Sequence, residues 1–291
     1  MIEINLEEII VISLCLAVLS SAMVAIVMRL GTQKVQHNIG MLTVNYVVCS
    51  LLSGFCGGYQ GAFDVSNPQV GMTLLMGVIN GGFYLAGFVL MQMNINRNGV
   101  VLSSIFQKLG LLVTLVLSVV FYHEIPTLMQ GGGFLIAVAA IILMNYQKGS
   151  ANAGGSKMAL MAMLLVSGMA EGMSKVFTES GVELALEGQF MLYTFATALV
   201  LCAALMLVKG QKVGKMEILC GALIGIPNFF TTKFLLGALE SLSGVIVYPV
   251  FSVGTILVVT MTGILAFRER LTRRQWLAIA AILVALVLLN I

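Results

Sequence analysis

Charge is scarce in this 291-residue chain: Asp, Glu, Lys and Arg make up 9% of it, whereas soluble domains contain roughly 25%. Apolar residues make up 59%, which excludes an ordinary soluble protein. The net charge is only +3, and no Lys/Arg run carries interleaved aromatic residues, so nucleic acid is not an expected partner. The N-terminus lacks the basic region of a signal peptide and carries Glu3, Glu7 and Glu8 instead. We therefore expect the first apolar stretch to be a retained helix.

Motifs for catalysis and metal binding are absent as well. The sequence has no His-Glu-x-x-His helix, no pair of intramembrane aspartates, no Gly-x-Ser-x-Gly and no nucleotide-binding Gly-x-x-x-x-Gly-Lys-Ser/Thr loop. Its two histidines, His37 and His123, fall at helix ends on opposite predicted faces, and the five cysteines have no metal-ligand spacing. We expect neither an enzyme nor an ATP-driven pump, and no metal or cofactor.

The second half of the chain repeats the first. A shift of 145 residues, without a gap, places Gly99-Val100 on Gly244-Val245 and Glu124-x-x-Thr127-x-x-Gln130 on Glu269-x-x-Thr272-x-x-Gln275. Each half contains five long apolar segments. Because five is odd, the halves must cross a membrane in opposite orientations. Inverted repeats are common in alternating-access transporters, which bind substrate where the halves meet.

Ten windows have the roughly 17–25 mostly apolar residues that a membrane-spanning helix needs. They are residues 9–28, 40–58, 70–93, 99–121, 127–145, 157–176, 189–208, 217–239, 243–267 and 275–290. We predict an all-α integral membrane protein with ten transmembrane helices, arranged as two inverted five-helix repeats. The repeats are expected at residues 1–148 and 157–291, joined by the Gly- and Ser-containing linker 149–156. Since one chain carries both repeats, a monomer should suffice, and dimerisation stays open.

The charged residues sort to opposite ends of these spans. One face receives Arg29, Lys34, Arg97, Lys148, Lys157, Lys209, Lys212, Lys215, Arg268, Arg270, Arg273 and Arg274. The other receives Asp64, Glu124, Glu179, Glu183, Glu187 and Glu240, with Lys175 at its edge. The positive-inside rule makes the basic face cytoplasmic. We therefore expect a multi-pass protein of the bacterial plasma membrane with both termini outside.

The repeated Thr-x-x-Gln has the spacing of a helix-capping box. Glu124 and Glu269 lie just before it, where a carboxylate can face the positive end of the following helix; a gating or coupling carboxylate is the alternative. Ten helices, an inverted repeat and the segments Phe121–Gln130 and Phe267–Gln275 resemble the EamA-type transporters of the drug/metabolite transporter superfamily. The resemblance implies transport of amino acids, sugars, nucleotide sugars, phosphorylated sugars or cationic drugs. It also implies that the third, fourth, eighth and ninth helices line the cavity.

Lys108 is the strongest candidate for substrate contact. It lies ten residues into the fourth predicted helix, about 15 Å along it, and charged groups at such depth usually face the bundle interior. Ser104 lies one turn before Lys108, and Gln107 belongs to a neighbouring polar row. The alternative for Lys108 is a structural bond to backbone carbonyls.

Two further ionisable residues lie within the predicted spans. Glu171 could carry a coupling proton, or it could form an intrahelical pair with Lys175 at spacing i, i+4. Lys233 lies on a different face of its helix from Asn228, so the two cannot face the cavity together, and whether Lys233 faces it is left open.

The remaining candidates for substrate binding are uncharged: Asn80 and Tyr84 on one helix face, Asn228 next to Pro227, and Tyr248 next to Pro249. The pairs Gly77-x-x-x-Gly81 and Gly221-x-x-x-Gly225 predict close helix packing.

These features favour a secondary active transporter of a small polar metabolite that works by alternating access. An anionic or zwitterionic substrate such as an amino acid, a sugar or a phosphorylated metabolite fits the lysines. A multidrug or cation exporter using Glu171 is the alternative, and a non-transporting membrane sensor or scaffold is a further one. Substrate and membrane lipid are the expected partners.

Overall fold

The computed structural model describes residues 6–32, 34–59, 67–98, 106–107, 109–145, 157–267 and 273–289. Within these residues the chain is all-helical, as predicted. The ten α-helices are α1 (Leu6–Thr32), α2 (Asn38–Ser53), α3 (Pro68–Asn98), α5 (Leu111–Tyr122), α6 (Leu128–Asn145), α7 (Lys157–Glu179), α8 (Glu187–Val208), α9 (Lys215–Leu239), α10 (Gly244–Phe267) and α11 (Arg273–Leu289). A π-helical turn (Gly54–Gly58) extends α2, and a 3₁₀ turn (Leu184–Leu186) precedes α8.

Seven of the described helices are long and apolar enough to cross a membrane. Their spans are Val11–Met28, Asn38–Gly58, Pro68–Met91, Lys157–Glu179, Leu184–Val208, Lys215–Leu239 and Gly244–Gly263. The apolar helices Leu111–Tyr122, Leu128–Leu143 and Trp276–Ala285 are shorter. The prediction of a multi-pass membrane protein is confirmed. Of the ten predicted spans, seven reach full length within the described residues.

The helices group into two compact units, and each unit draws on both halves of the sequence. Unit 1 comprises Met1–Leu85 and Val176–Glu240, and unit 2 comprises Ala86–Lys175 and Ser241–Ile291. Helices α3 and α7 therefore contribute one part to each unit. The predicted linker, residues 149–156, lies outside the described residues.

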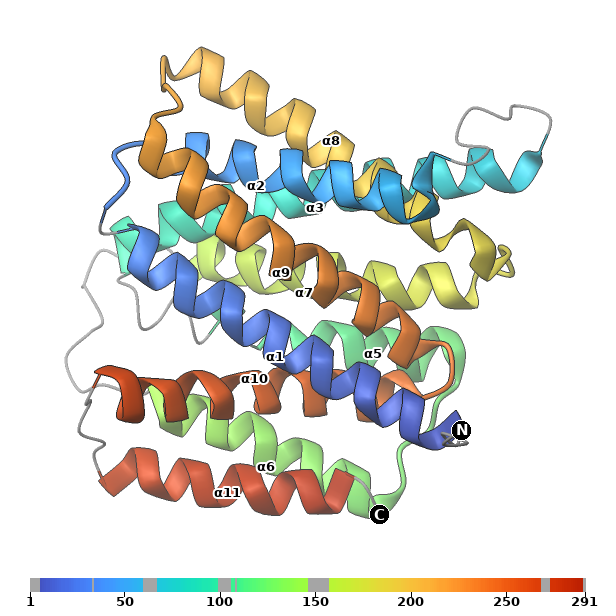
Figure 1. The fold of residues 1–291 in the computed structure, drawn as a ribbon. Helices are drawn as coiled ribbons and strands as arrows, with labels where there is room; N and C mark the ends of the chain where they lie inside the picture. Colours follow the sequence, from blue (N-terminus) through green and yellow to red (C-terminus); the bar gives the residue numbers. More distant parts are fainter. Residues whose placement is uncertain are drawn as a thin grey trace, which may run out of the picture. The chain divides into compact units, whose positions relative to one another are not determined.

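In unit 1, α9 packs against both α1 and α2, and α2 also packs against α8 (Figure 1). Glycine allows the α2–α9 contact. A Cβ atom at Gly221 would lie 2.5 Å from the Met41 carbonyl oxygen, and one at Gly225 would lie 2.8 Å from the Asn45 carbonyl oxygen. Gly77 and Gly81 approach the α8 backbone in the same way. The prediction that both glycine pairs serve close packing is confirmed.

In unit 2, α6 packs along α11, and α10 contacts α5, α6 and α11 (Figure 1). Small side chains hold these helices close, since Ala137, Ala140, Val253 and Ala285 form one buried cluster. Helix α7 joins the unit through Gly168, where a Cβ atom would lie 2.5 Å from the Gly110 carbonyl oxygen.

The predicted capping box forms at the start of α6. The Thr127 N–H donates to Gln130 Oε1 at 3.0 Å, and the Gln130 N–H donates to Thr127 Oγ1 at 3.2 Å. His123 ends α5 in a left-handed conformation with φ 55° and turns the chain toward this box. Thr272, in the second copy of the motif, lies outside the described residues.

A Gly221→Ala substitution is expected to destabilise the protein by about 1–3 kcal/mol, because the added methyl group collides with backbone and with Val44 Cβ. The matched control is Gly82→Ala, since a Cβ at Gly82 meets nothing within 4 Å. The control should be neutral or slightly stabilising. Thermal unfolding of both variants in detergent checks the prediction. Equal melting temperatures would show that the α2–α9 approach does not depend on glycine.

Candidate functional site

Polar side chains of α2 and α9 meet in unit 1. Asn228 of α9 donates from Nδ2 to Asn45 Oδ1 of α2 at 3.2 Å. Beside it, Cys49 of α2 donates from Sγ to the carbonyl oxygen of Gly225 at 3.2 Å. Polar groups in an apolar bundle lose free energy unless they are paired, so these bonds align the two helices. Asn228, predicted to bind substrate, therefore lies within a polar network.

Asn80 lies on α3 and is 1% exposed. Its Nδ2 atom donates to Thr194 Oγ1 of α8 at 3.5 Å. Its Oδ1 atom is buried and has no hydrogen-bond partner among the described residues. Buried polar atoms are almost always paired in native proteins. An acceptor left open at this position suits a ligand that donates a hydrogen bond.

Tyr84, one turn after Asn80, connects the same four helices. Its hydroxyl lies 3.4 Å from Thr232 Oγ1 of α9. Its ring meets Tyr46 of α2 edge-on at 6.4 Å and Phe195 of α8 at 5.9 Å between centroids. Such aromatic pairs fix the ring orientation. The Tyr84 hydroxyl is thus held toward the Asn228–Thr232 turn.

We call the group formed by Asn45, Tyr46, Asn80, Tyr84, Thr194, Asn228 and Thr232 the four-helix polar cluster. Its members come from α2, α3, α8 and α9. They carry no formal charge at neutral pH, but they offer both amide and hydroxyl donors and acceptors. Chemically, the cluster can recognise a small polar molecule through directed hydrogen bonds.

Lys233 belongs to a different group in unit 1. It interacts electrostatically with Glu187 at the start of α8, and Glu187 also interacts with Glu240. Partial burial raises the pKa of the Glu240 carboxyl above its ordinary value. Lys233 thus has an acidic neighbour on α8, whereas Asn228 bonds to α2.

The central feature of unit 2 is an ion pair between Lys175 of α7 and Glu124, which follows α5. Lys175 Nζ lies 2.5 Å from Glu124 Oε1, with side chains 2% and 16% exposed. The same ammonium group lies 5.8 Å from the centroid of the Tyr122 ring. Glu124 Oε2 also accepts a bond from the Val245 N–H at 3.4 Å, at the start of α10. Glu124 was expected to face the start of α6; its carboxylate is instead shared by Lys175 and α10.

In unit 2 the side chain of Tyr248 bonds to the backbone of Glu171. The fully buried Tyr248 donates from its hydroxyl to the Glu171 carbonyl oxygen at 3.3 Å. The Glu171 side chain is half-buried on α7, one turn before Lys175. Its assignment as the coupling carboxylate stays a prediction.

The fourth-helix candidates fall at the edge of what the structure describes. Lys108 and Ser104 lie outside the described residues, and Gln107 is exposed. Their proposed substrate contacts therefore stay predictions.

Sequence reasoning did not single out Thr194 and Thr232 of the cluster. The signal for Thr194 was available, because it and Thr197 are hydroxyl-bearing residues three positions apart on α8. Thr232 lies one turn after Asn228 on α9, and its hydroxyl donates to the Asn228 carbonyl oxygen at 3.4 Å.

Comparison with known proteins agrees with this architecture. Residues 8–146 match the family model of the EamA-like transporter family. An uncharacterized protein of Haemophilus influenzae is 25% identical over 202 residues, which cover 66% of this chain and 67% of that protein. A protein of known crystal structure superposes with a TM-score of 0.73 over 95% of this chain and 94% of that one, at 14% identity. The last similarity concerns the fold alone.

Proposed function

We propose that the chain, whose residues 8–146 match the EamA-like transporter family, is a secondary active transporter that moves a small polar metabolite by alternating access. The observation that carries this proposal is the four-helix polar cluster. It gathers hydrogen-bonding groups from four apolar helices. Polar groups within membrane helices cost free energy, so they are expected where they stabilise helix packing or bind a ligand. The open acceptor of Asn80 favours a ligand.

The inverted repeat is supported by equivalent contacts in the two halves. Gly77 and Gly81 pack α3 of the first half against α8 of the second half. Gly221 and Gly225 pack α9 of the second half against α2 of the first half. Counted within its own half, the third helix (α3 or α9) thus contacts the second helix (α8 or α2) of the other half. The pairs α2–α8, α5–α10 and α6–α11 join helices that hold the same position in the two halves. A two-fold relation between the halves accounts for all of these contacts.

The substrate class follows from the groups assigned to the site. The cluster itself is uncharged and suits hydroxyl, amide or amino groups. Lys108, as proposed from the sequence, would add a cationic contact for a carboxylate or phosphate. Glu171 would carry the coupling proton. An amino acid, a sugar or a phosphorylated metabolite fits this combination.

Thermal-shift screening of the purified protein with amino acids, neutral sugars, sugar phosphates and organic cations tests the transport hypothesis. The same screen is repeated with the Lys108→Ala variant. Binding stabilises the native state by mass action, by about 2.7 kcal/mol at 100 times the dissociation constant. Anionic or zwitterionic ligands that stabilise wild type and lose their effect in Lys108→Ala are expected. Stabilisation by cations alone would contradict the metabolite proposal and favour the multidrug exporter. No stabilisation by any class would favour a sensor or scaffold.

We place the protein in the bacterial plasma membrane with both termini outside, because the basic residues lie on one predicted face. A C-terminal alkaline phosphatase fusion is expected to be active, and a C-terminal green fluorescent protein fusion is expected to be dark. The reverse pattern, a fluorescent and phosphatase-negative pair, would place the C-terminus in the cytoplasm and reverse the assigned orientation.

A further inference from the structure

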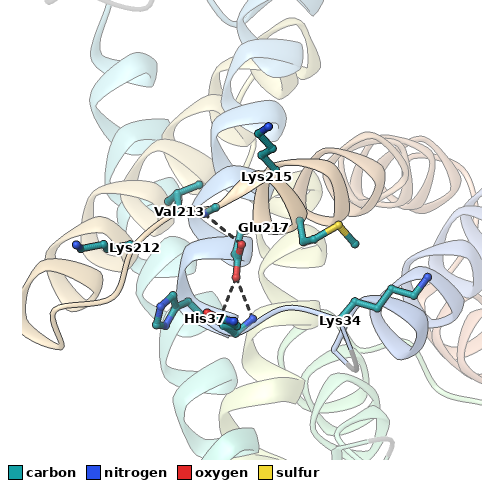
Figure 2. A pocket seen from close by; sticks show the side chains of 9 residues that line it. Lys34, His37, Lys212, Val213, Lys215 and Glu217 are labelled. Atoms are coloured by element: carbon teal, nitrogen blue, oxygen red, sulfur yellow. Dashed lines mark hydrogen bonds between the residues drawn. The ribbon is translucent and has the colours of Figure 1, made fainter.

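A basic pocket lies away from the four-helix polar cluster, at the loops that join α1 to α2 and α8 to α9. Its volume is about 450 Å³. Three lysines, Lys34, Lys212 and Lys215, line it together with His37 and a single acidic residue, Glu217. Figure 2 shows the Glu217 carboxylate between the two loops and the lysines on three sides of it.

Glu217 fixes the shape of this pocket. Its Oε1 atom accepts bonds from the N–H groups of Gln36 at 2.9 Å and His37 at 3.1 Å (Figure 2). Its Oε2 atom accepts from the Gly214 N–H at 3.1 Å. The first turn of α2 also packs against the α8–α9 loop, since a Cβ atom at Gly40 would lie 2.9 Å from the Lys212 carbonyl oxygen. The bonds of the Glu217 carboxylate to backbone N–H groups of both segments thus preform the pocket, and among the described residues the lysine ammonium groups take no part in them.

The lysines carry uncompensated positive charge. All three are exposed, and among the described residues none of them forms an ion pair. Both oxygens of the one acidic neighbour are occupied by backbone N–H groups. The pocket therefore attracts an anion, and lysine ammonium groups bind phosphate as point charges.

The surroundings distinguish a lipid headgroup from a free anion. The pocket lies at the ends of four candidate membrane spans, those of α1, α2, α8 and α9, which is the depth of the headgroup layer. The helix segments that adjoin the lining residues in the sequence carry large exposed apolar side chains: Leu207 and Val208 at the end of α8 are 75% and 85% exposed, and Ile218 and Leu219 in α9 are both 53% exposed. Two of the lining residues, Val213 and Met216, are themselves apolar. A phospholipid whose phosphate lies in the pocket can therefore place its acyl chains along these helices.

We propose that this pocket binds the phosphate of an anionic phospholipid, with Lys34, Lys212 and Lys215 as its ligands. Basic pockets on the cytoplasmic side of membrane helices recognise such headgroups, and the positive-inside rule assigns this face to the cytoplasm. The lipid bridges the α1–α2 and α8–α9 loops at a place separate from the proposed substrate site.

The test is a native mass spectrometry titration of the full-length protein with phosphatidylglycerol and with phosphatidylcholine. Wild type should bind phosphatidylglycerol about tenfold more tightly than phosphatidylcholine, and the variant Lys34→Gln/Lys212→Gln/Lys215→Gln should lose that preference. The control Arg97→Gln/Lys157→Gln/Arg273→Gln removes three exposed positive charges elsewhere and should keep it. A second variant, Lys34→Arg/Lys212→Arg/Lys215→Arg, preserves the charge and should bind like wild type, and the glutamine variant should keep the wild-type melting temperature, which separates loss of the site from loss of folding.

Two results would overturn the proposal. An equal loss of the phosphatidylglycerol preference in the pocket variant and in the charge-matched control would show that the binding depends only on net charge. Displacement of phosphatidylglycerol by inorganic phosphate, beyond the effect of chloride at the same ionic strength, would show a site for free phosphate in place of lipid. Retention of the lipid in phosphate is the result expected for a headgroup site anchored by its acyl chains.

Discussion

Replacing Lys175 with methionine is expected to lower the free energy of unfolding by about 3 kcal/mol. Methionine keeps the length and apolar volume of the lysine stem but removes the ammonium group that faces Glu124 at 2.5 Å. Removing one member of a buried ion pair typically costs 3–5 kcal/mol, because the remaining charge is left without compensation. The value lies at the lower end here, since the Glu124 side chain is 16% exposed and retains its bond from the Val245 N–H.

Denaturant titration in detergent micelles measures this effect, with Lys157→Met as the matched control. Lys157 lies on the same helix but is exposed, so its loss should change stability by less than about 0.5 kcal/mol. The double variant Lys175→Met/Glu124→Gln should recover most of the loss, because no unpaired charge remains. If Lys175→Met proved as stable as Lys157→Met, the ion pair would contribute nothing to the folded state.

Replacing Asn80 with leucine is expected to reduce transport about 10- to 100-fold while leaving stability unchanged or slightly raised. The loss follows if the open Oδ1 acceptor binds substrate, because a missing hydrogen bond to a ligand costs about 1–3 kcal/mol. Stability should change little because leucine has a similar shape, and the loss of the long Nδ2–Thr194 Oγ1 bond of 3.5 Å is offset by removal of a buried oxygen that has no partner among the described residues. A purely structural asparagine would lose stability together with transport.

Transport is measured as counterflow of each compound that stabilises the purified protein, in proteoliposomes containing wild type or variant. The control is Thr73→Val on the same helix, because Thr73 is also buried, and within the described part of the chain its hydroxyl donates to the Gln69 carbonyl of α3 alone. It should transport like wild type. An Asn80→Leu protein with wild-type counterflow would remove Asn80 from the site.

Local patterns in the sequence predicted local structure well. The Thr127-x-x-Gln130 spacing predicted the capping box because both partners lie within one helical turn. The Gly-x-x-x-Gly pairs predicted close packing because small residues on one face allow little else. The all-helical membrane architecture followed from the length of the apolar segments.

Contacts between distant residues could not be predicted from a single sequence. The ion pair of Lys175 with Glu124 joins residues 51 positions apart in the chain, and no spacing in the sequence indicates it. The periodicity of one helix carries no information about which other helix it faces. For the same reason Thr194 was missed, since its importance depends on Asn80 of α3.

We propose that the four-helix polar cluster binds the transported molecule, and counterflow in proteoliposomes with wild type, Asn80→Leu and Thr73→Val tests this, using the compounds that raise the melting temperature of the purified protein. Saturable counterflow of a small polar metabolite is expected in wild type and Thr73→Val and should be lost in Asn80→Leu, with all three proteins folded. Counterflow that is equal in all three, or absent for every stabilising compound, would show that the cluster does not bind the transported molecule.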